Sequence, residues 1–541
     1  MKKRNLILAS FIILLAILTG ACSTQERSIP VQEADVALAE NPVPKPDAAQ
    51  AEIVNPIQST GITSYLFAPI RSTTTYLMDA EGNALQTWES AYTPGNAVYL
   101  QENGNLLRTG SVKSTKFGVG GTGGIIEEIA SDGSVVWAYQ YANDQVQQHH
   151  DIEQMPNGNI LMIAWGLKSQ ADAIAAGRDP SLLSDGELWP DHVIELNPTT
   201  NTIVWEWHVW DHLVQDYDAS KANYGTVSEH PGLVDINFVA RKADADWNHT
   251  NSIDYNAELD QILLSVHSFS EIWIIDHDTT TKTATGTAGD LLYRWGNPQT
   301  YDAGSSGDQQ FYTQHDAQWI AAGMPGAGNI LVFNNGDRQT RAYSSVDEIV
   351  PPLNADGGYS LSGAAYTPAA PVWTYVADTP SDFYADHISG AQRLSNGNTL
   401  ICSGTDGSFF EVTSAGEVIW RYDYGANVFR VIRYESDYAG LQFLDTQPTT
   451  STNAGLPVDN AAGGGQPANA LGQNNSQQGN RPRLDLASAA STLGVTEEAL
   501  RKALGTPPPD FAAIAAQLGI TEQALIDALG IPTGGPPNSG G

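Results

Sequence analysis

The chain has 541 residues, of which 41% are hydrophobic and 16% are charged, so it can bury a large core and is not a disordered protein. Its 26 basic and 61 acidic residues give a formal net charge of −35. A surface this acidic repels nucleic acid and anionic membranes, which excludes nucleic acid as a partner. An anionic substrate would therefore need a locally positive site.

The N-terminus reads as a targeting segment. A basic stretch at residues 1–4 precedes an apolar run from Leu6 to Leu18, which is too short for a comfortable membrane span but has the length of a signal peptide. The small residues that lead to Cys22 resemble a bacterial lipobox. The pattern predicts a lipoprotein signal peptide over residues 1–22, with Cys22 lipidated after cleavage; ordinary cleavage or an uncleaved anchor is the alternative.

This prediction places the protein in the periplasm, attached to the bacterial envelope through the lipid alone. Ser23 follows the cysteine, and an Asp that would suggest retention at the inner membrane is absent, so the outer membrane is favoured. Cys402 is the only other cysteine, so the mature chain cannot form an intrachain disulfide.

Composition divides the remainder of the chain into four parts. Residues 23–60 are rich in Pro, Ala, Gln and Glu and read as a linker. From 61 to 447, short β-rich runs alternate with turn residues, which is an all-β pattern. Residues 448–483 read as a disordered linker, and residues 484–531 contain a repeat of 25 residues in which Gly and Thr separate helical stretches, predicting two helical hairpins.

Internal repeats define the architecture of the β-rich part. One unit is an apolar-acidic strand, a turn and a strand that closes on Trp, and it recurs at Trp88, Trp137, Trp205, Trp295, Trp373 and Trp420. A second unit, an apolar strand opened by Gly-Asn, precedes several copies, and its Gly-Asn pairs suit hairpin turns. Six copies predict a six-bladed β-propeller, all-β in class, with a small C-terminal α-helical hairpin appendage.

Histidines fall into register when the repeats are aligned on Gly-Asn. His150 and His315 share one position, which Gly95, Asn251 and Ser389 occupy in other repeats, while His249 and His387 lie two residues earlier. Because side chains alternate along a strand, both registers lie on one face. On innermost strands, the four histidines would point at the channel mouth and His149 would face the other way. The alternative is that a repeated His bonds its own backbone.

Arg338 follows the strand Ile330–Phe333, in a loop where its guanidinium can grip an oxyanion in a bidentate manner; the alternative is a surface arginine paired with Asp337. Neutral imidazoles alone can bind a metal. A mixed set of His and Arg suits a tetrahedral oxyanion, whose charge positioned cations stabilise during group transfer. We therefore expect neither a metal nor a cofactor in this site.

Four segments resemble the bacterial arylsulfate sulfotransferases over residues 61–447: residues 246–252, 314–317, 333–336 and 387–394. The closing segment 429–434 also resembles that family. The resemblance implies a six-bladed periplasmic propeller that moves a sulfuryl group from an aryl sulfate to a phenol. It further implies a ping-pong mechanism through a sulfohistidine, without a nucleotide donor.

On motif position, the resemblance assigns catalytic roles to His249, His315, Arg338 and His387. His387 would be the nucleophile, and the other three would hold the sulfuryl oxygens or relay the proton. We expect His150, Asn251 and Asn335 to bind substrate. Familiar members carry an N-terminal β-sandwich used for dimerisation and a disulfide, neither of which fits this sequence, so the oligomeric state stays open. Two other functions also stay open: a metal-dependent propeller lyase or hydrolase, and a non-catalytic envelope scaffold.

Overall fold

The computed structural model describes residues 50–52, 63–239, 243–361 and 363–446, together with single residues 456, 515 and 521. The chain separates into two compact units, 1–461 and 462–541, and every element below belongs to the first. The predicted signal peptide with Cys22 lies outside the described residues. The linker 448–483 and the helical hairpins 484–531 lie outside them as well, apart from those single residues.

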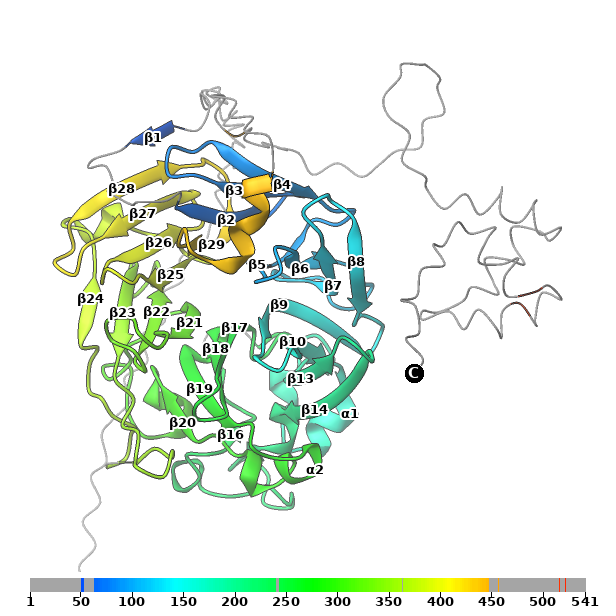
Figure 1. Ribbon diagram of the computed structural model, residues 1–541. Coiled ribbons are helices and arrows are strands. Elements are labelled where there is room, and N and C mark those ends of the chain that lie inside the picture. The colour runs from blue at the N-terminus through cyan, green and yellow to red at the C-terminus, as the bar shows by residue number, and fades with distance from the viewer. Residues whose placement is uncertain are drawn as a thin grey trace, which may run out of the picture. The chain divides into compact units, whose positions relative to one another are not determined.

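Six antiparallel sheets are arranged around a common axis as the blades of a propeller, as predicted (Figure 1). Blades 1 to 3, written from the innermost strand outward, consist of β29 (Val428–Tyr434), β2 (Ser64–Pro69), β3 (Thr74–Met78) and β4 (Ala84–Glu89); β5 (Pro94–Leu100), β6 (Leu106–Ser111), β7 (Gly124–Ile129) and β8 (Val135–Gln140); and β9 (Val146–Gln154), β10 (Ile160–Gly166), β13 (Asp191–Asn197) and β14 (Thr202–His208). Blades 4 to 6 consist of β17 (Thr250–Asn256), β18 (Gln261–Val266), β19 (Glu271–Asp276) and β20 (Tyr293–Trp295); β21 (His315–Trp319), β22 (Ile330–Asn334), β23 (Ser345–Ile349) and β24 (Trp373–Tyr375); and β25 (Gly390–Arg393), β26 (Thr399–Ser403), β27 (Ser408–Val412) and β28 (Val418–Asp423).

The ring closes by pairing strands from its two ends. The last strand, β29, is the innermost strand of blade 1 and pairs antiparallel with β2, Ser64 opposite Tyr434. The three-residue strand β1 (Gln50–Glu52) pairs with the outer edge of blade 6, so part of the segment predicted as a linker is a strand. Pairing ends that lie more than 360 residues apart costs loop-closure entropy, which the burial of six blades must offset.

The tryptophans of the sequence repeat link each blade to the next. The indole N–H groups donate, in chain order, from Trp137 to Asn201, Trp205 to Thr279, Trp295 to the Pro368 carbonyl, Trp373 to the Ser414 carbonyl and Trp420 to the Ala80 carbonyl. Trp88, the sixth copy, packs edge-on against Phe443. The repeated Trp therefore makes a packing contact that recurs from blade to blade, which is why the repeat identifies the fold.

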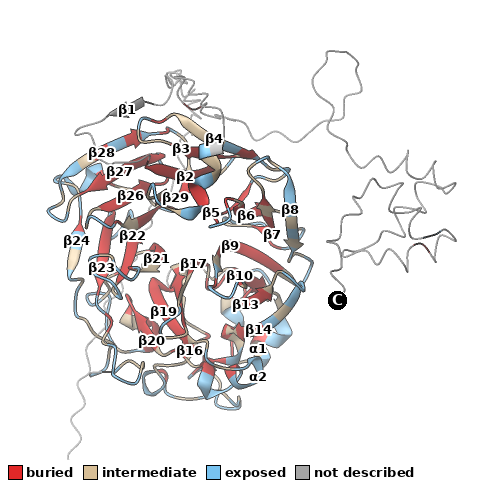
Figure 2. Cartoon of the chain, in the orientation of Figure 1, coloured by how far each residue is buried: buried red, intermediate tan, exposed pale blue. Residues whose placement is uncertain are grey.

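The core lies between neighbouring blades, and exposed residues gather on outermost strands such as β8, β14 and β28, whereas β20 is buried (Figure 2). For example, Leu161 and Ile163 of β10 pack in one cluster with Ile253, Ile262 and Leu264 of blade 4. Burying such a side chain contributes about 1.5–3 kcal/mol. Within the described residues, no helix has the length and apolar character needed to cross a membrane.

Connections between strands carry the remaining elements. Blade 3 has a small hairpin and helix between its second and third strands, and the longest insertion precedes blade 4. These elements are β11 (Lys168–Ser169), α1 (Gln170–Ala175), η1 (Pro180–Leu182), β12 (Glu187–Leu188), η2 (Val209–Asp211), β15 (Leu213–Val214), η3 (Val227–Glu229), β16 (Val234–Asp235), η4 (His267–Phe269), α2 (Thr281–Ala284), η5 (Thr287–Gly289), η6 (Pro298–Tyr301), η7 (Pro380–Asp382) and η8 (Ala439–Thr446).

Candidate functional site

β-Bulges shape the innermost strands near the channel mouth. The register between β9 and β10 shifts between Met162 and Ala164, and the register between β21 and β22 shifts after His315. His150 and Asp316 adopt φ values of 50° and 54° at these bulges. An extra residue at a bulge interrupts the alternation of side chains. Successive residues can therefore both reach the axis, contrary to the strict alternation expected from the sequence.

The structure brings three of the predicted histidines together and adds a fourth. The ring centroid of His249 lies 4.6 Å from that of His150 and 4.9 Å from that of His267, which in turn lies 5.3 Å from His315. Phe429 of β29 lies 6.2 Å from His150 and 6.3 Å from His315. These four imidazoles and Phe429 come from blades 1, 3, 4 and 5, so they surround the axis of the propeller.

His249 is the member of this cluster that pairs with a carboxylate. Burial would lower its pKa, but the ion pair and hydrogen bond between its Nδ1 and the carboxylate of Asp246 offset that effect, and its pKa is raised. The segment 246–252, which contains both residues, is one of those that carry the family resemblance.

His150 is neutral in contrast. Burial, followed by the charge of His249, holds its pKa well below the usual value. Its Nδ1 lies 2.9 Å from Nδ1 of His149, whose ring stacks on Trp165 with centroids 4.1 Å apart. His149 was expected to face away from His150; the bulge places the two rings beside each other instead.

His315 is engaged at both ring nitrogens. Its Nδ1 lies 2.8 Å from Oδ1 of Asn335, and its Nε2 accepts a hydrogen bond from the backbone N–H of Ile388 at 3.2 Å. These partners fix the tautomer with hydrogen on Nδ1. Burial lowers the pKa of His315 to about 3, so the ring is neutral.

The two predicted substrate-binding asparagines are buried in the wall of the site. Asn335 donates from Nδ2 to the carbonyls of Ala385 and Ile388, both at 2.8 Å. It therefore holds, with His315, the segment that carries His387. Asn251 donates from Nδ2 to the Gln314 carbonyl at 2.8 Å, which joins blades 4 and 5.

An open cavity of about 1000 Å³ lies beside this cluster. Its walls combine cationic, aromatic and amide side chains, among them His267, Gln309, Tyr312, Arg338, Tyr384, Asp386 and His387. The cavity holds two of the four predicted catalytic residues, Arg338 and His387, whose side chains are 77% and 57% exposed. It is large enough for an aryl sulfate and its acceptor.

Asp386 joins these two residues. Nη2 of Arg338 donates to one carboxylate oxygen at 2.6 Å, and Nδ1 of His387 lies 2.6 Å from the other. Burial would raise the pKa of Asp386, but the hydrogen bond from His387 and the charge of Arg338 hold it below its usual range. The arginine therefore pairs with Asp386 rather than with Asp337, the neighbour considered from the sequence.

His387 lies in a turn before β25 and not on the strand itself. Ile388 and Ser389, which follow it, adopt φ values of 50° and 85°. The Oγ of Ser389 accepts a hydrogen bond from the backbone N–H of Gly404 at 2.9 Å, which fixes this turn to the end of β26. The shared strand face expected for all four histidines therefore does not hold for His387.

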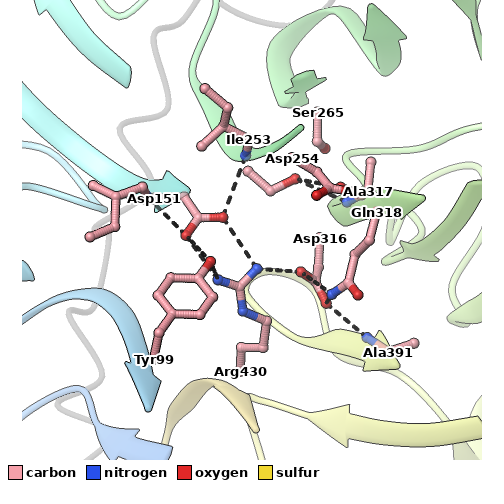
Figure 3. Close-up of polar contacts among 12 residues, drawn as sticks. Tyr99, Asp151, Ile253, Asp254, Ser265, Asp316, Ala317, Gln318, Ala391 and Arg430 are labelled. Atoms are coloured by element: carbon pink, nitrogen blue, oxygen red, sulfur yellow. Dashed lines mark hydrogen bonds and ion pairs between the residues drawn. The ribbon is translucent and has the colours of Figure 1, made fainter. Parts of the chain in front are cut away.

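A buried ion cluster crosses the channel, with Arg430 between Asp151 and Asp316 (Figure 3). Arg430 donates to Asp316 at 2.5 Å, to Asp151 at 2.8 and 3.2 Å, and to the hydroxyl of Tyr99. Asp151 and Asp316 directly follow His150 and His315 in the chain. Burial would lower the pKa of Arg430, but the charges of Asp151, Tyr99 and Asp316 outweigh it and raise that pKa well above the usual value. The guanidinium therefore stays charged and ties together blades 1, 2, 3 and 5.

Sequence reasoning missed His267, Asp386 and the Arg430 cluster. His267 follows β18 as Asn335 follows β22, so aligning the second strands would have found it. The His-Asp dipeptide, which occurs at 150–151 and again at 315–316, was a signal for the ion cluster. Within the described residues, no group of three or more His, Cys, Asp or Glu side chains is placed to hold a metal ion.

Several solved structures show a weak similarity to this chain. Among solved structures, a protein of unknown function from Bacteroides caccae is 12% identical, with a TM-score of 0.39, over 69% of this chain and 99% of that one. Virginiamycin B lyase from Staphylococcus aureus is 10% identical, with a TM-score of 0.32, over 69% and 87%. Apo AztD from Citrobacter koseri is 11% identical, with a TM-score of 0.32, over 70% and 98%. These similarities are too weak to carry an argument.

Comparison with curated proteins yields no match. A family model described as arylsulfotransferase (ASST) matches residues 60–441. The matched span contains all six blades, the cavity, the histidine cluster and the Arg430 cluster. This chain belongs to the arylsulfotransferase family.

Proposed function

We propose that this protein transfers a sulfuryl group from an aryl sulfate to a phenol through a covalent sulfohistidine on His387, without a nucleotide donor. Family membership supports sulfuryl transfer in general. The observation that carries the finer proposal is that His387 and Arg338 line one cavity and share the carboxylate of Asp386.

The first step uses the tautomer that Asp386 favours. With the Nδ1 hydrogen of His387 donated to the carboxylate, the lone pair on Nε2 is available to attack sulfur. The N–S bond forms as the bond between sulfur and the aryl oxygen breaks, and the aryl oxide leaves. A neutral imidazole thereby becomes a sulfonated imidazolium, whose positive charge lies beside the ionised Asp386.

Arg338 and His249 supply the positive charge. The transferring group is expected to carry charge on its equatorial oxygens, and fixed cations near them lower the barrier. Arg338 lines the cavity and contacts Asp386 and Tyr384. Because a guanidinium has five N–H donors, the remaining ones can point to the sulfuryl oxygens. The imidazolium of His249, held by Asp246, adds charge behind the cavity wall.

The neutral, buried residues act by holding the others. His315 and Asn335 fix the backbone beside His387, and Asn251 joins blades 4 and 5 next to His249. His150 packs against His249 on the blade 3 side. In this proposal, these four residues define the shape of the acceptor side, and their contact with substrate is indirect.

We also propose that the protein works in the periplasm, anchored by a lipid on Cys22 to the envelope. The basic and apolar stretches that precede Cys22 support this proposal. Metabolic labelling with radioactive palmitate tests it: the wild-type chain takes up label in a bacterial host, and the Cys22→Ala variant does not. Equal labelling of both would contradict lipidation at this residue.

The transfer proposal is tested by incubating the purified protein with 4-nitrophenyl sulfate and phenol. We expect release of nitrophenol that depends on phenol, together with formation of phenyl sulfate, and loss of both in His387→Asn. His208→Asn, on the outermost strand β14, is the matched control and should keep activity. Absence of transfer at every pH would favour a binding or scaffold function instead.

A further inference from the structure

We propose that His267 accepts the proton of the acceptor phenol in the second half-reaction. This inference rests on the proposed function and names a residue that the family resemblance does not assign. His267 begins η4, directly after β18, and lines the same cavity as His387 and Arg338.

The position of His267 is fixed by its neighbours. Its backbone N–H donates to the carbonyl of His249 at 3.3 Å, and its ring lies between those of His249 and His315, at 4.9 and 5.3 Å. Ser270, three residues on, lies at φ 55° and donates its backbone N–H to the His267 carbonyl at 3.0 Å, so the short helix ends in a tight turn. The imidazole is thus presented to the cavity by a constrained segment.

The other imidazoles of the cluster are less suited to accept a proton from a substrate. Nδ1 of His249 is held by Asp246, whose charge raises the pKa of that ring and so favours its protonated form. Both nitrogens of His315 are engaged with Asn335 and Ile388.

His150 is 3% exposed, its Nδ1 faces His149, and the backbone of Gly121 lies against its ring, since a Cβ added there would lie 2.0 Å from it. None of these three rings lines the cavity, whereas His267 and His387 do. With His387 carrying the sulfuryl group, His267 is the other imidazole among the described residues that lines the cavity and is placed to accept the proton.

The second half-reaction exchanges one bond to sulfur for another. The phenol oxygen attacks sulfur, a new O–S bond forms and the N–S bond to Nε2 of His387 breaks. The electron pair of that bond returns to the imidazole, which becomes neutral, and the phenol proton passes to a ring nitrogen of His267. In the first half-reaction, His267 acts in the opposite direction: its protonated form donates a proton to an aryl oxide that is a poor leaving group. The 4-nitrophenolate ion is a good leaving group and departs without that proton.

The role of His267 as a base can be tested by comparing acceptors of different acidity, because an acceptor that is already ionised needs no base. His267→Gln should still release one nitrophenolate per enzyme from 4-nitrophenyl sulfate when no acceptor is present. Transfer to phenol should be slowed by about 10²- to 10⁴-fold, the usual contribution of a positioned base. Transfer to pentafluorophenol, which is ionised at neutral pH, should be slowed far less. His208→Gln is the matched control. Transfer rates are divided by the amount of nitrophenolate released in the burst, so that misfolded molecules do not contribute.

A second variant guards against a purely structural effect. In His267→Ala, added imidazole should restore part of the transfer to phenol and have little effect on transfer to pentafluorophenol. Equal slowing with both acceptors, wild-type transfer in His267→Gln, or loss of its burst would each overturn the role given to His267. Absence of the burst in the wild-type protein would instead overturn the sulfohistidine on which the inference rests.

Discussion

The carboxylate of Asp386 lies 2.6 Å from Nδ1 of His387, the next residue in the chain. The same carboxylate accepts from Arg338, so a single acidic group orients both the proposed nucleophile and the proposed oxyanion clamp. Neighbouring residues of a strand point in opposite directions, and this contact is possible because both lie in the turn before β25. The turn, which departs from regular strand geometry, therefore brings together the residues that are proposed to react.

Replacing Asp386 by Asn should slow formation of the sulfohistidine by about 10²-fold or more, because the amide can favour the wrong tautomer of His387. KM for the donor should change less than kcat, since Arg338 remains in place. Stopped-flow measurement of the nitrophenolate burst checks this prediction, with Asp382→Asn on exposed η7 as the control. A wild-type burst rate in Asp386→Asn would show that the carboxylate does not orient the nucleophile.

Replacing Arg338 by Ala should lower kcat/KM for the aryl sulfate by about 10²- to 10³-fold, the cost of one lost oxyanion donor. Arg421→Ala, on the outer strand β28, removes an exposed arginine of the same charge and should have little effect. Steady-state kinetics with both variants separate a local role from a general effect of charge. Similar kinetics for Arg338→Ala and wild type would assign Arg338 to the surface.

Replacing Arg430 by Met should destabilise the propeller by about 3–5 kcal/mol, because it leaves the buried carboxylates of Asp151 and Asp316 without their counter-charge. Arg421→Met, which removes the exposed ion pair between Arg421 and Asp423, should lower the free energy of unfolding by less than about 1 kcal/mol. Urea unfolding of both variants gives the comparison. Equal stabilities would mean that the cluster across the channel contributes little to the fold.

The contribution of His315 and His150 to stability should fall as the pH falls from about 6.5 toward 3. His315 has a folded-state pKa of about 3, and that of His150 is also lowered, so the unfolded chain binds protons in this window that the folded chain does not. Each histidine contributes a slope of up to about 1.4 kcal/mol per pH unit. His249, whose pKa is raised, acts in the opposite sense: its stabilisation is full below its usual pKa and is lost as the pH rises through the raised value.

Urea unfolding as a function of pH checks this assignment. The His315→Gln variant should show a shallower decline between about pH 6.5 and pH 4 than the wild type, because one titrating group is gone. Parallel declines would show that His315 does not titrate between the two states as its burial implies.

The sequence predicts the propeller well because each blade repeats the same local tasks. The Trp that closes each repeat must reach the next blade, and the Gly-Asn pair must form the hairpin between the first two strands, as at Asn103 to Asn105 between β5 and β6. Those tasks leave residues at fixed spacings. Alignment on them finds the innermost strands and places His150, His249 and His315 near one another.

The site is less predictable because bulges and turns displace its residues from strict alternation. The alignment of the repeats makes Gly95 the equivalent of His150. In the structure, Tyr99 pairs with Leu107 as Glu153 pairs with Leu161, so the residue equivalent to His150 is Asn96. His387 lies in a turn, and His267 follows a second strand that the alignment of first strands does not examine. No repeat marks Asp386, because one blade alone needs it.

Mass spectrometry at neutral pH can detect the proposed covalent intermediate on His387. After incubation with 4-nitrophenyl sulfate and no acceptor, the peptide that contains His387 should gain the mass of one SO₃ on that residue, and the gain should disappear when phenol is added. Absence of the modification in protein that still transfers the sulfuryl group, or its persistence in His387→Asn, would contradict the account.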